Sequence, residues 1–567
     1  MKTAQRHLWH WFWEIASPYW KQDEKWQAWG LLVLLLVLLL GQTGFAVLFN
    51  EQTGEFTSAL AARDPERFWQ AIRVCLGLLV AAVPLFALYY GVRDTLGNRW
   101  RRWLTQQFLQ RYFSHRNFYA LNANAALDNP DQRMTEDINT FTQRSLFFLL
   151  ILIASLLQLI AFSQVLWGIS HELVYFLVVY AIVGTWITLA VYGRPLIGLN
   201  FRQLRREADF RFSLVRVREH AESIAFYRGE TQEIQQVQRR FMAAFDNVNR
   251  LIRRQFFLNL FQYAYSMLTI VLPSALIASR VLSGELEVGR AIQAAGAFAA
   301  VLSAISLIVD NFESLSRFAA GIERLNSFSQ ALNGPPQTLA APHGVIESVA
   351  DERLALENVT LLTPRHERVL VKDLSIAVEP GESLLIVGAS GSGKSSLLRA
   401  IAGLWDAGSG RILRPQPPDI LFLPQQPYTQ LGTLRSQLLY PYPERTVDDG
   451  DLLDLLAQVN LPELAQRVGG LDTELDWPKV LSIGEQQRLA FARVLLIRPR
   501  FAILDEASSA LDMANEESLY RQLMATHTTL VSVGHRPSIL PFHRRVLELT
   551  GEGTWRTLPA QDYRFEI

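Results

Sequence analysis

The first 310 residues alternate long apolar stretches without charge and stretches rich in arginine. Residues 26–50 carry no charged side chain and include the run LLVLLLVLLL. A helix needs about 20 apolar residues to cross the roughly 30 Å of hydrocarbon in a bilayer. The pattern predicts six membrane-spanning helices within residues 1–332. The five other charge-free windows are 74–92, 145–170, 173–193, 255–279 and 291–309.

A soluble helical bundle and a cleaved signal peptide both fit these windows less well. Helices buried in a large soluble bundle would be shorter and amphipathic. A charged residue at the centre of a membrane helix costs roughly 2.5–3.5 kcal/mol, so six windows without one indicate a membrane. A cleaved signal peptide is not expected either, because the first apolar core is long and follows 25 residues rich in tryptophan and charge.

Arginine is distributed unequally between the segments that join the windows. Residues 93–144 hold eight arginines and residues 194–254 hold thirteen. The three alternate segments, 51–73, 171–172 and 280–290, hold five between them. Because positive charge stays on the cytoplasmic side, the two long segments and both termini are predicted to be cytoplasmic. The long segments have apolar residues at helical spacing, so we expect the spans to continue as helical extensions.

The character of the chain changes after residue 332. The stretch NGPPQTLAAPHG breaks a helix, and residues 333–350 are predicted to be a linker. From residue 351 to 567, short runs of valine, leucine and isoleucine alternate with helical segments, which is typical of an α/β domain. The predicted architecture is an all-α membrane domain of six helices followed by an α/β domain.

Composition narrows the class of partner. Charged residues make up only 19% of the chain, whereas soluble domains average about a quarter. The 54 basic and 54 acidic residues give a net charge of zero. Nucleic-acid-binding domains usually have an excess of basic residues, so nucleic acid is not expected as a partner, whereas the lipid bilayer is. A single cysteine, Cys75, excludes a disulfide within the chain and a cysteine-rich metal site.

The α/β segment contains a phosphate-binding loop. The stretch GASGSGKS, residues 388–395, matches GxxxxGK[ST] with an apolar strand before it and a helix after it. Glycines allow backbone amides to approach phosphate oxygens, and the helix N-terminus favours the negative charge. Lys394 is expected to reach the β- and γ-phosphates, and Ser395 to bind Mg²⁺. The predicted nucleotide-binding residues are Gly388, Ala389, Ser390, Gly391, Ser392, Gly393, Lys394, Ser395 and Ser396.

Three further residues follow apolar strands. Asp505 ends the run FAILD, where an acid commonly helps to hold Mg²⁺. Glu506 comes next and is placed to polarise an attacking water as a general base. His535 follows the run TTLVSV and is predicted to contact the γ-phosphate.

These elements resemble, in order, those of the ATP-binding cassette (ABC) family. The phosphate loop is followed by LPQQ with Gln425, LSIGEQQR at 481–488, ILDE at 503–506 and SALD at 509–512. LSIGEQQR is similar to the family's LSGGQ signature, which covers ATP bound to the partner subunit. The resemblance implies an ATP-hydrolysing half-transporter that acts as a dimer, most simply a homodimer, with two composite ATP sites. It adds Gln425 to Asp505 and Ser395 as an Mg²⁺ ligand, and Ser482, Gly484, Glu485 and Asp512 as nucleotide-site residues.

Two features depart from the family pattern. Ile483 stands where the family usually has glycine, and a β-branched residue does not readily adopt φ > 0. Ile483 therefore either slows hydrolysis or is accommodated by the partner. The region about 25 residues before the phosphate loop lacks the aromatic residue that stacks on adenine in many cassettes, and Thr363 takes that place.

The resemblance extends to one subfamily. Residues 421–441, 532–543 and 551–555 resemble subfamily D half-transporters of the peroxisomal acyl-CoA and lysosomal cobalamin type. Residues 128–138 and 219–230 are similar to that subfamily and to bacterial SbmA/BacA-like transporters. By analogy, we expect a bacterial inner membrane protein that moves a bulky solute such as cobalamin or a peptide. Fatty acyl-CoA or lipid is the alternative solute, and the direction of transport stays open.

A different class of function is an ATP-gated channel or a regulatory subunit with little hydrolysis. Ile483 favours it, whereas Glu506 and His535 argue against it. A soluble cassette that acts on ribosomes or DNA is excluded by the six predicted spans.

Overall fold

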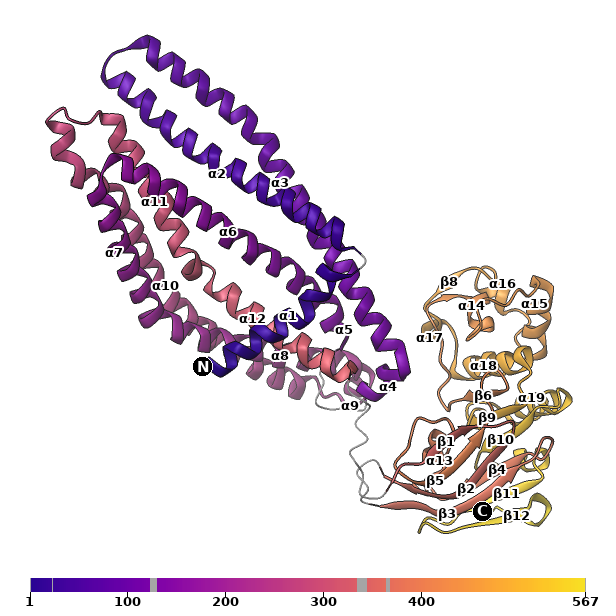
Figure 1. Ribbon diagram of the computed structural model, residues 1–567. Coiled ribbons are helices and arrows are strands. Elements are labelled where there is room, and N and C mark those ends of the chain that lie inside the picture. The colour runs from indigo at the N-terminus through magenta and orange to yellow at the C-terminus, as the bar shows by residue number, and fades with distance from the viewer. Residues whose placement is uncertain (1, 23, 123–129, 334–343, 364–367, 566–567) are drawn as a thin grey trace. The chain divides into compact units, whose positions relative to one another are not determined.

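The computed structural model describes residues 2–22, 24–122, 130–333, 344–363 and 368–565. The chain divides into two compact units, Met1–Pro336 and Gln337–Ile567 (Figure 1). Part of the predicted linker, residues 334–343, lies outside the described residues. Its last residues are not a linker, because β1 (Glu347–Ala350) pairs in parallel with β5 (Gly408–Arg414).

The first unit consists of helices over its described residues. The long helices α2, α3, α6, α10 and α11 contain apolar stretches that are long enough to cross a membrane. The helices are α1 (Lys2–Lys21), α2 (Lys25–Ala61), α3 (Pro65–Phe113), α4 (Asn117–Asn122), α5 (Pro130–Gln132), α6 (Ile138–Ile169), α7 (His171–Ile187), α8 (Arg194–Glu219), α9 (Ala221–Tyr227), α10 (Glu230–Leu282), α11 (Val288–Asp310) and α12 (Phe312–Asn333). Shorter 3₁₀ or π segments are η1 (Ser114–Arg116), η2 (Arg133–Asp137) and η3 (Thr188–Gly193).

The outer surface of these helices is apolar. In the apolar windows of the five long helices, only 13% to 39% of the residues are buried within the chain. Val80, Val83 and Trp186 are 74%, 71% and 68% exposed. A soluble bundle would bury such side chains, whereas a bilayer covers them. The exposure therefore agrees with the membrane prediction and not with the soluble alternative.

The fourth predicted span differs from the other five. Residues 173–193 fall on α7, which has 17 residues, and on the π-helical segment η3. By length and composition α7 is a shorter apolar helix, and only the other five predicted spans lie on described helices long enough to cross a membrane. The charge-free window is therefore continuous in sequence but changes its helical geometry near its end.

Two helices extend far beyond a bilayer. α3 has 49 residues and α10 has 53. At 1.5 Å per residue they are about 75–80 Å long, against roughly 30 Å of hydrocarbon. The arginine-rich segments thus continue the spans as helices, as the periodicity predicts.

The N-terminal helix α1 packs on the first unit through aromatic side chains. Tyr19 is buried and stacks on Trp100 of α3 with ring centroids 5.8 Å apart. Phe12 contacts Phe141 of α6 and Phe318 of α12. The tryptophan-rich N-terminus is therefore part of the core of this unit.

The second unit is an α/β domain with two larger sheets. In the six-stranded sheet, the order is β12-β11-β4-β10-β9-β6, and only β12 runs antiparallel. The other sheet has the order β1-β5-β2-β3. The strands are β2 (Leu354–Leu362), β3 (Val369–Val378), β4 (Leu384–Gly388), β6 (Ile420–Leu423), β7 (Gly432–Thr433), β8 (Glu474–Leu475), β9 (Phe501–Asp505), β10 (Thr529–Val533), β11 (Arg545–Leu549) and β12 (Trp555–Pro559).

Helices of this unit cover the six-stranded sheet and build a helical region beside it (Figure 1). Buried side chains of the strands and of α18 and α19 form one apolar core, with Trp477, Phe491 and Tyr520 as its largest members. The helices are α13 (Lys394–Ile401), α14 (Leu434–Leu439), α15 (Asp449–Gln458), α16 (Leu464–Arg467), α17 (Trp477–Val480), α18 (Ile483–Ile497) and α19 (Met513–Ala525), with 3₁₀ turns η4 (Pro537–Phe542) and η5 (Ala560–Asp562).

Candidate nucleotide-binding site

The predicted site residues meet at one edge of the parallel sheet. β4, β10, β9 and β6 are neighbours in that order, and each is followed directly by a candidate residue or loop. The phosphate loop follows β4, His535 follows β10, Asp505 ends β9 and Gln425 follows β6. Ligands of open α/β sheets bind outside the carboxyl ends of the strands, and this arrangement explains why residues far apart in sequence form one site.

The phosphate loop needs glycine at particular positions. Gly388, Gly391 and Gly393 have φ of 148°, 80° and 100°, a region that other residues rarely adopt. A Cβ atom on Gly388 would lie 2.3 Å from the carbonyl oxygen of Leu549. The conformation of the loop therefore requires glycine at these three positions. At Gly388 a side chain would also collide with the neighbouring strand.

Lys394 begins α13 and is buried beneath the loop. Its Nζ donates hydrogen bonds to the carbonyl oxygens of Gly388 and Ala389, at 2.8 and 3.0 Å. Burial lowers the pKa of Lys394, while Glu506 and Asp505 act in the opposite direction. The ammonium group thus lies where it neutralises negative charge at the loop.

Ser395 and Asp505 connect the loop to β9. Ser395 Oγ lies 3.4 Å from Asp505 Oδ1 and donates to it. Burial, with a smaller contribution from Glu506, raises the pKa of Asp505. A cation between these groups would favour the charged carboxylate.

Glu506 is held between two polar partners. Gln425 Nε2 donates to Glu506 Oε2 at 2.9 Å, and His535 Nε2 lies 3.1 Å from Glu506 Oε1. Glu506 has φ of 47°, a left-handed conformation that costs on the order of 1–3 kcal/mol in a residue with a side chain. Its amide donates to the carbonyl oxygen of Val533 on β10, which fixes the turn.

The signature stretch forms the start of α18. Ser482 caps the helix and forms a capping box with Glu485. Glu485 also pairs with Arg467 at 2.7 Å. Ile483 is the first helical residue, is 62% exposed, and is not among the described residues with positive φ. The predicted conflict between a β-branched side chain and φ > 0 therefore does not arise.

Three residues that the sequence reasoning did not single out connect the site's loops. Gln487 of α18 donates to Ser509 Oγ at 3.2 Å and accepts from the amide of Ala510 at 2.9 Å. Arg536, next to His535, donates to the carbonyl oxygens of Ser509 and Leu511. Glu516 is buried and accepts from Ser508 Oγ at 2.6 Å. Gln487 and Arg536 lie inside the motifs quoted above, so their positions in those motifs could have identified them as site residues. Nothing in the sequence marks Glu516 as one.

The remaining predicted residues lie in the same motifs with less direct roles. Ala389 and Ser390 are exposed in the loop, and Ser396 is half-buried in the first turn of α13. Gly484 lies in the first turn of α18, and a Cβ there would lie 3.2 Å from the carbonyl oxygen of Ala510. Asp512 caps α19 by accepting from the amide of Asn515 at 2.8 Å.

The donor set suits a magnesium nucleotide. Among the described residues, no group of three or more histidine, cysteine or acidic side chains forms a metal site. Mg²⁺ bound with phosphates uses only one or two protein carboxylates, so Asp505 with Ser395 and Gln425 fits it. Ser392 Oγ is buried and has no hydrogen-bond partner among the described residues, which suits a phosphate oxygen.

Two family models match the chain. Residues 20–282 match "ABC transporter transmembrane region 2", and residues 371–509 match "ABC transporter". An uncharacterised ABC transporter ATP-binding protein of Synechocystis is 49% identical over 96% of this chain and 83% of its own length. The chain belongs to the ABC transporter family. It is therefore an integral membrane protein that binds ATP and couples its hydrolysis to transport.

Other relatives of this ABC transporter belong to subfamily D. ABC transporter D family member 2, chloroplastic, of Arabidopsis thaliana is 40% identical over 98% of this chain and 89% of its own. The human lysosomal cobalamin transporter ABCD4 is 32% identical over 96% and 95%. The predicted resemblance is thus confirmed.

The fold has a solved counterpart. A bacterial Atm1-family ABC exporter with ATP bound superposes with a TM-score of 0.75 at 19% identity, over 94% of this chain and 95% of that one. The predicted fold class, a helical membrane domain of the exporter type followed by an α/β nucleotide-binding domain, is confirmed.

Proposed function

We propose that this ABC transporter works as a homodimer with two composite ATP sites. The observation that carries this proposal is the convergence of Lys394, Asp505, Glu506, Gln425 and His535 at the carboxyl ends of four adjacent strands. The described residues of a single chain contain one such set of strand ends and one signature helix. Exposed Ile483 at the start of that helix leaves its N-terminus open to a second copy.

Within each site the chain's residues have separate tasks. Lys394 and the loop amides bind the β- and γ-phosphates, and Ser482 and Gly484 of the partner copy cover them. Ser395, Asp505 and Gln425 hold Mg²⁺, which offsets phosphate charge when bound. Glu506 accepts a proton from the attacking water, and His535, 3.1 Å from it, orients that carboxylate and the γ-phosphate.

We further propose that the membrane is a bacterial inner membrane and that both termini are cytoplasmic. The eight and thirteen arginines of residues 93–144 and 194–254, against five in the three alternate segments, support the orientation. The similarity to the Synechocystis protein supports a bacterial membrane. The Arabidopsis relative is named as chloroplastic, so relatives of this chain also occur in an organelle.

The transported solute is proposed to be bulky and hydrophilic, such as cobalamin or a peptide. Similarity to the lysosomal cobalamin transporter supports cobalamin as the first compound to test. Fatty acyl-CoA or lipid is the alternative solute class.

The test is ATPase turnover of the purified full-length protein in lipid nanodiscs. Cobalamin, a basic peptide and an acyl-CoA are added separately, and Glu506→Gln provides the background rate. Stimulation of ATPase turnover by cobalamin or by the peptide supports the proposal. Stimulation by acyl-CoA alone would instead identify fatty acyl-CoA as the class of solute. Turnover no higher than the Glu506→Gln background under every condition would favour an ATP-gated or regulatory role.

A further inference from the structure

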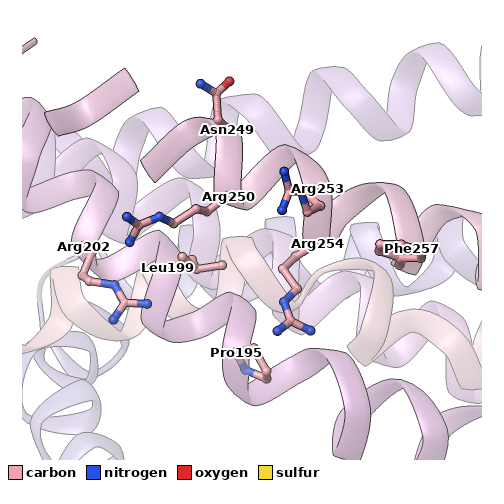
Figure 2. Close-up of a pocket in the computed structure, with 8 residues that line it drawn as sticks. All are labelled: Pro195, Leu199, Arg202, Asn249, Arg250, Arg253, Arg254 and Phe257. Atoms are coloured by element: carbon pink, nitrogen blue, oxygen red, sulfur yellow. The ribbon is translucent and has the colours of Figure 1, made fainter. Parts of the chain in front are cut away.

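A cavity in the membrane unit is lined by four arginines. It has a volume of about 590 Å³ and lies between α8 and α10 (Figure 2). Arg202 comes from α8, and Arg250, Arg253 and Arg254 come from α10. The remaining lining residues are Pro195, Leu199, Asn249 and Phe257. The cavity therefore combines several positive charges with a few apolar side chains.

The cavity lies where the apolar windows end. On α10 the charge-free stretch 255–279 begins directly after Arg254. On the other wall the charge-free stretch 173–193 ends just before α8 begins, and Pro195 and Leu199 lie in the first turns of α8. Both walls thus pass from apolar to arginine-rich at the same level. In a bilayer this level is the boundary between hydrocarbon and headgroups.

The four arginines have no neutralising neighbour within the described part of the chain. No carboxylate is found among the described lining residues, and none of the four makes a hydrogen bond or ion pair with another described residue. A second cavity of about 470 Å³, between α3 and α6, is different. It is lined by Arg93, Arg101 and Arg144 and by one carboxylate, Asp94, which pairs with Arg93 at 2.9 Å. Of these two cavities, the α8–α10 cavity has more arginines, four against three, and no carboxylate among its described lining residues.

Polar contacts join the two helices that form the walls of the cavity. Asn247 of α10 is fully buried, and its Nδ2 donates to the carbonyl oxygen of Leu199 and to Gln203 Oε1, both at 3.0 Å. Further along, Arg240 donates to the carbonyl oxygen of Asp209 at 2.9 Å. These contacts hold α8 and α10 together beside the cavity.

We propose that this cavity binds the headgroup of an anionic phospholipid. Arginine forks match phosphate oxygens in pairs, and basic pockets between membrane helices at this level suit acidic headgroups. The four arginines contact the phosphate and the acidic headgroup, while Phe257 and Leu199 contact the start of the acyl chains. The proposal does not depend on which solute the protein moves or on the direction of transport.

The test is native mass spectrometry of the full-length protein in detergent, titrated with phosphatidylglycerol or phosphatidylcholine. Wild type is expected to retain phosphatidylglycerol preferentially. One interfacial arginine contributes about 1 kcal/mol, so Arg202→Gln should weaken that binding about fivefold. Arg205→Gln is the matched control, because Arg205 is exposed one turn further along α8 and does not line the cavity. It should change binding less than about twofold.

Two additional measurements separate the outcomes. The Arg253→Lys, Arg254→Lys double variant keeps the charge but loses the forks, and it should bind more weakly than wild type even if the Gln variants are unstable. Equal losses for Arg202→Gln and Arg205→Gln would overturn the proposal in favour of general electrostatic attraction. Competition by free glycerol phosphate or inorganic phosphate as strong as by the lipid would overturn it in favour of a soluble anion.

Discussion

Arg493 of the nucleotide-binding unit and Arg254 of the membrane unit of this ABC transporter have opposite environments. In the nucleotide-binding unit, Arg493 is 7% exposed, donates to the carbonyl oxygens of Gln437 and Tyr428, and lies over the ring of Tyr440. Burial lowers its pKa to about 10. In the membrane unit, exposed arginines such as Arg254 line a cavity without a partner among the described residues.

The difference reflects the surroundings of each unit. In the nucleotide-binding unit, hydrogen bonds within the chain hold Glu506 and Lys394 in fixed positions at the carboxyl ends of the strands. The membrane unit leaves apolar side chains exposed on its outside, where a bilayer covers them. Under our proposal, an anionic lipid is the partner of the cavity arginines. Substitutions in the nucleotide-binding unit should therefore act through contacts within the protein. Those in the membrane unit should act through packing between helices or through lipid.

The largest effect is expected for Glu506→Gln in the nucleotide-binding unit. Removing the general base should lower ATP hydrolysis about a hundredfold or more, while ATP binding remains, since Lys394 and the loop are unchanged. Turnover and nucleotide binding are measured on the same nanodisc preparation. Glu517→Gln, at an exposed ion pair with Arg521 on α19, is the control and should retain normal turnover. Near-normal ATP hydrolysis by Glu506→Gln would show that Glu506 is not the general base.

A pH-dependent loss of stability is expected from His543. Its Nδ1 donates to the carbonyl oxygen of Ile539 and its Nε2 accepts from Ser532 Oγ, both at 2.8 Å, so the neutral ring is satisfied. Burial lowers its pKa to about 4. The unfolded chain binds a proton near pH 6.5, so the stabilisation is present above that pH and is lost as pH falls towards 4.

The expected slope is about 1.4 kcal/mol per pH unit within that window. The unfolding of the nucleotide-binding unit is followed in the full-length protein between pH 7 and 4, and His543→Gln should flatten the profile. His527→Gln, at an exposed histidine of the same unit, should leave the profile unchanged. An unaltered slope in His543→Gln would assign the acid sensitivity to other groups.

A smaller effect, in the membrane unit, is expected where α2 and α11 approach closely. A Cβ on Gly289 would lie 1.9 Å from the carbonyl oxygen of Gly54, and the Gly289 amide donates to Ser58 Oγ. Gly289→Ala should destabilise the unit by about 1–3 kcal/mol. Gly77→Ala, where nothing lies within 4 Å, should be neutral or slightly stabilising. Thermal unfolding in detergent compares the two, and equal midpoints would contradict this packing.

The sequence predicts the two units by different signals. Windows without charge identify the spans because lipid removes the need for an amphipathic pattern, and this holds even where the helices are exposed. Motif order identifies the ATP site because Lys394, Asp505 and His535 all follow strands of one sheet, although their sequence separation gives no distance.

Other features depend on tertiary contacts that one sequence does not specify. Burial of Glu516 follows from helix packing, and the left-handed turn at Glu506 follows from its bond to Val533. The role of α1 depends on Tyr19 reaching Trp100, which is 81 positions away. The four arginines of the α8–α10 cavity lie on two different helices, so their gathering is visible only in the fold.

The smallest effect is expected for Ile483→Gly in the signature stretch. Ile483 is the first residue of α18, its side chain is exposed, and Ser482 and Glu485 cap the helix without it. Glycine would keep the backbone amide and the helix N-terminus, so ATPase turnover should stay within about twofold of wild type, which corresponds to a change of about 0.4 kcal/mol in the activation barrier. Ile483→Ala is the control for side-chain bulk alone. A tenfold rise in both variants would contradict this expectation and would show that the isoleucine side chain hinders hydrolysis.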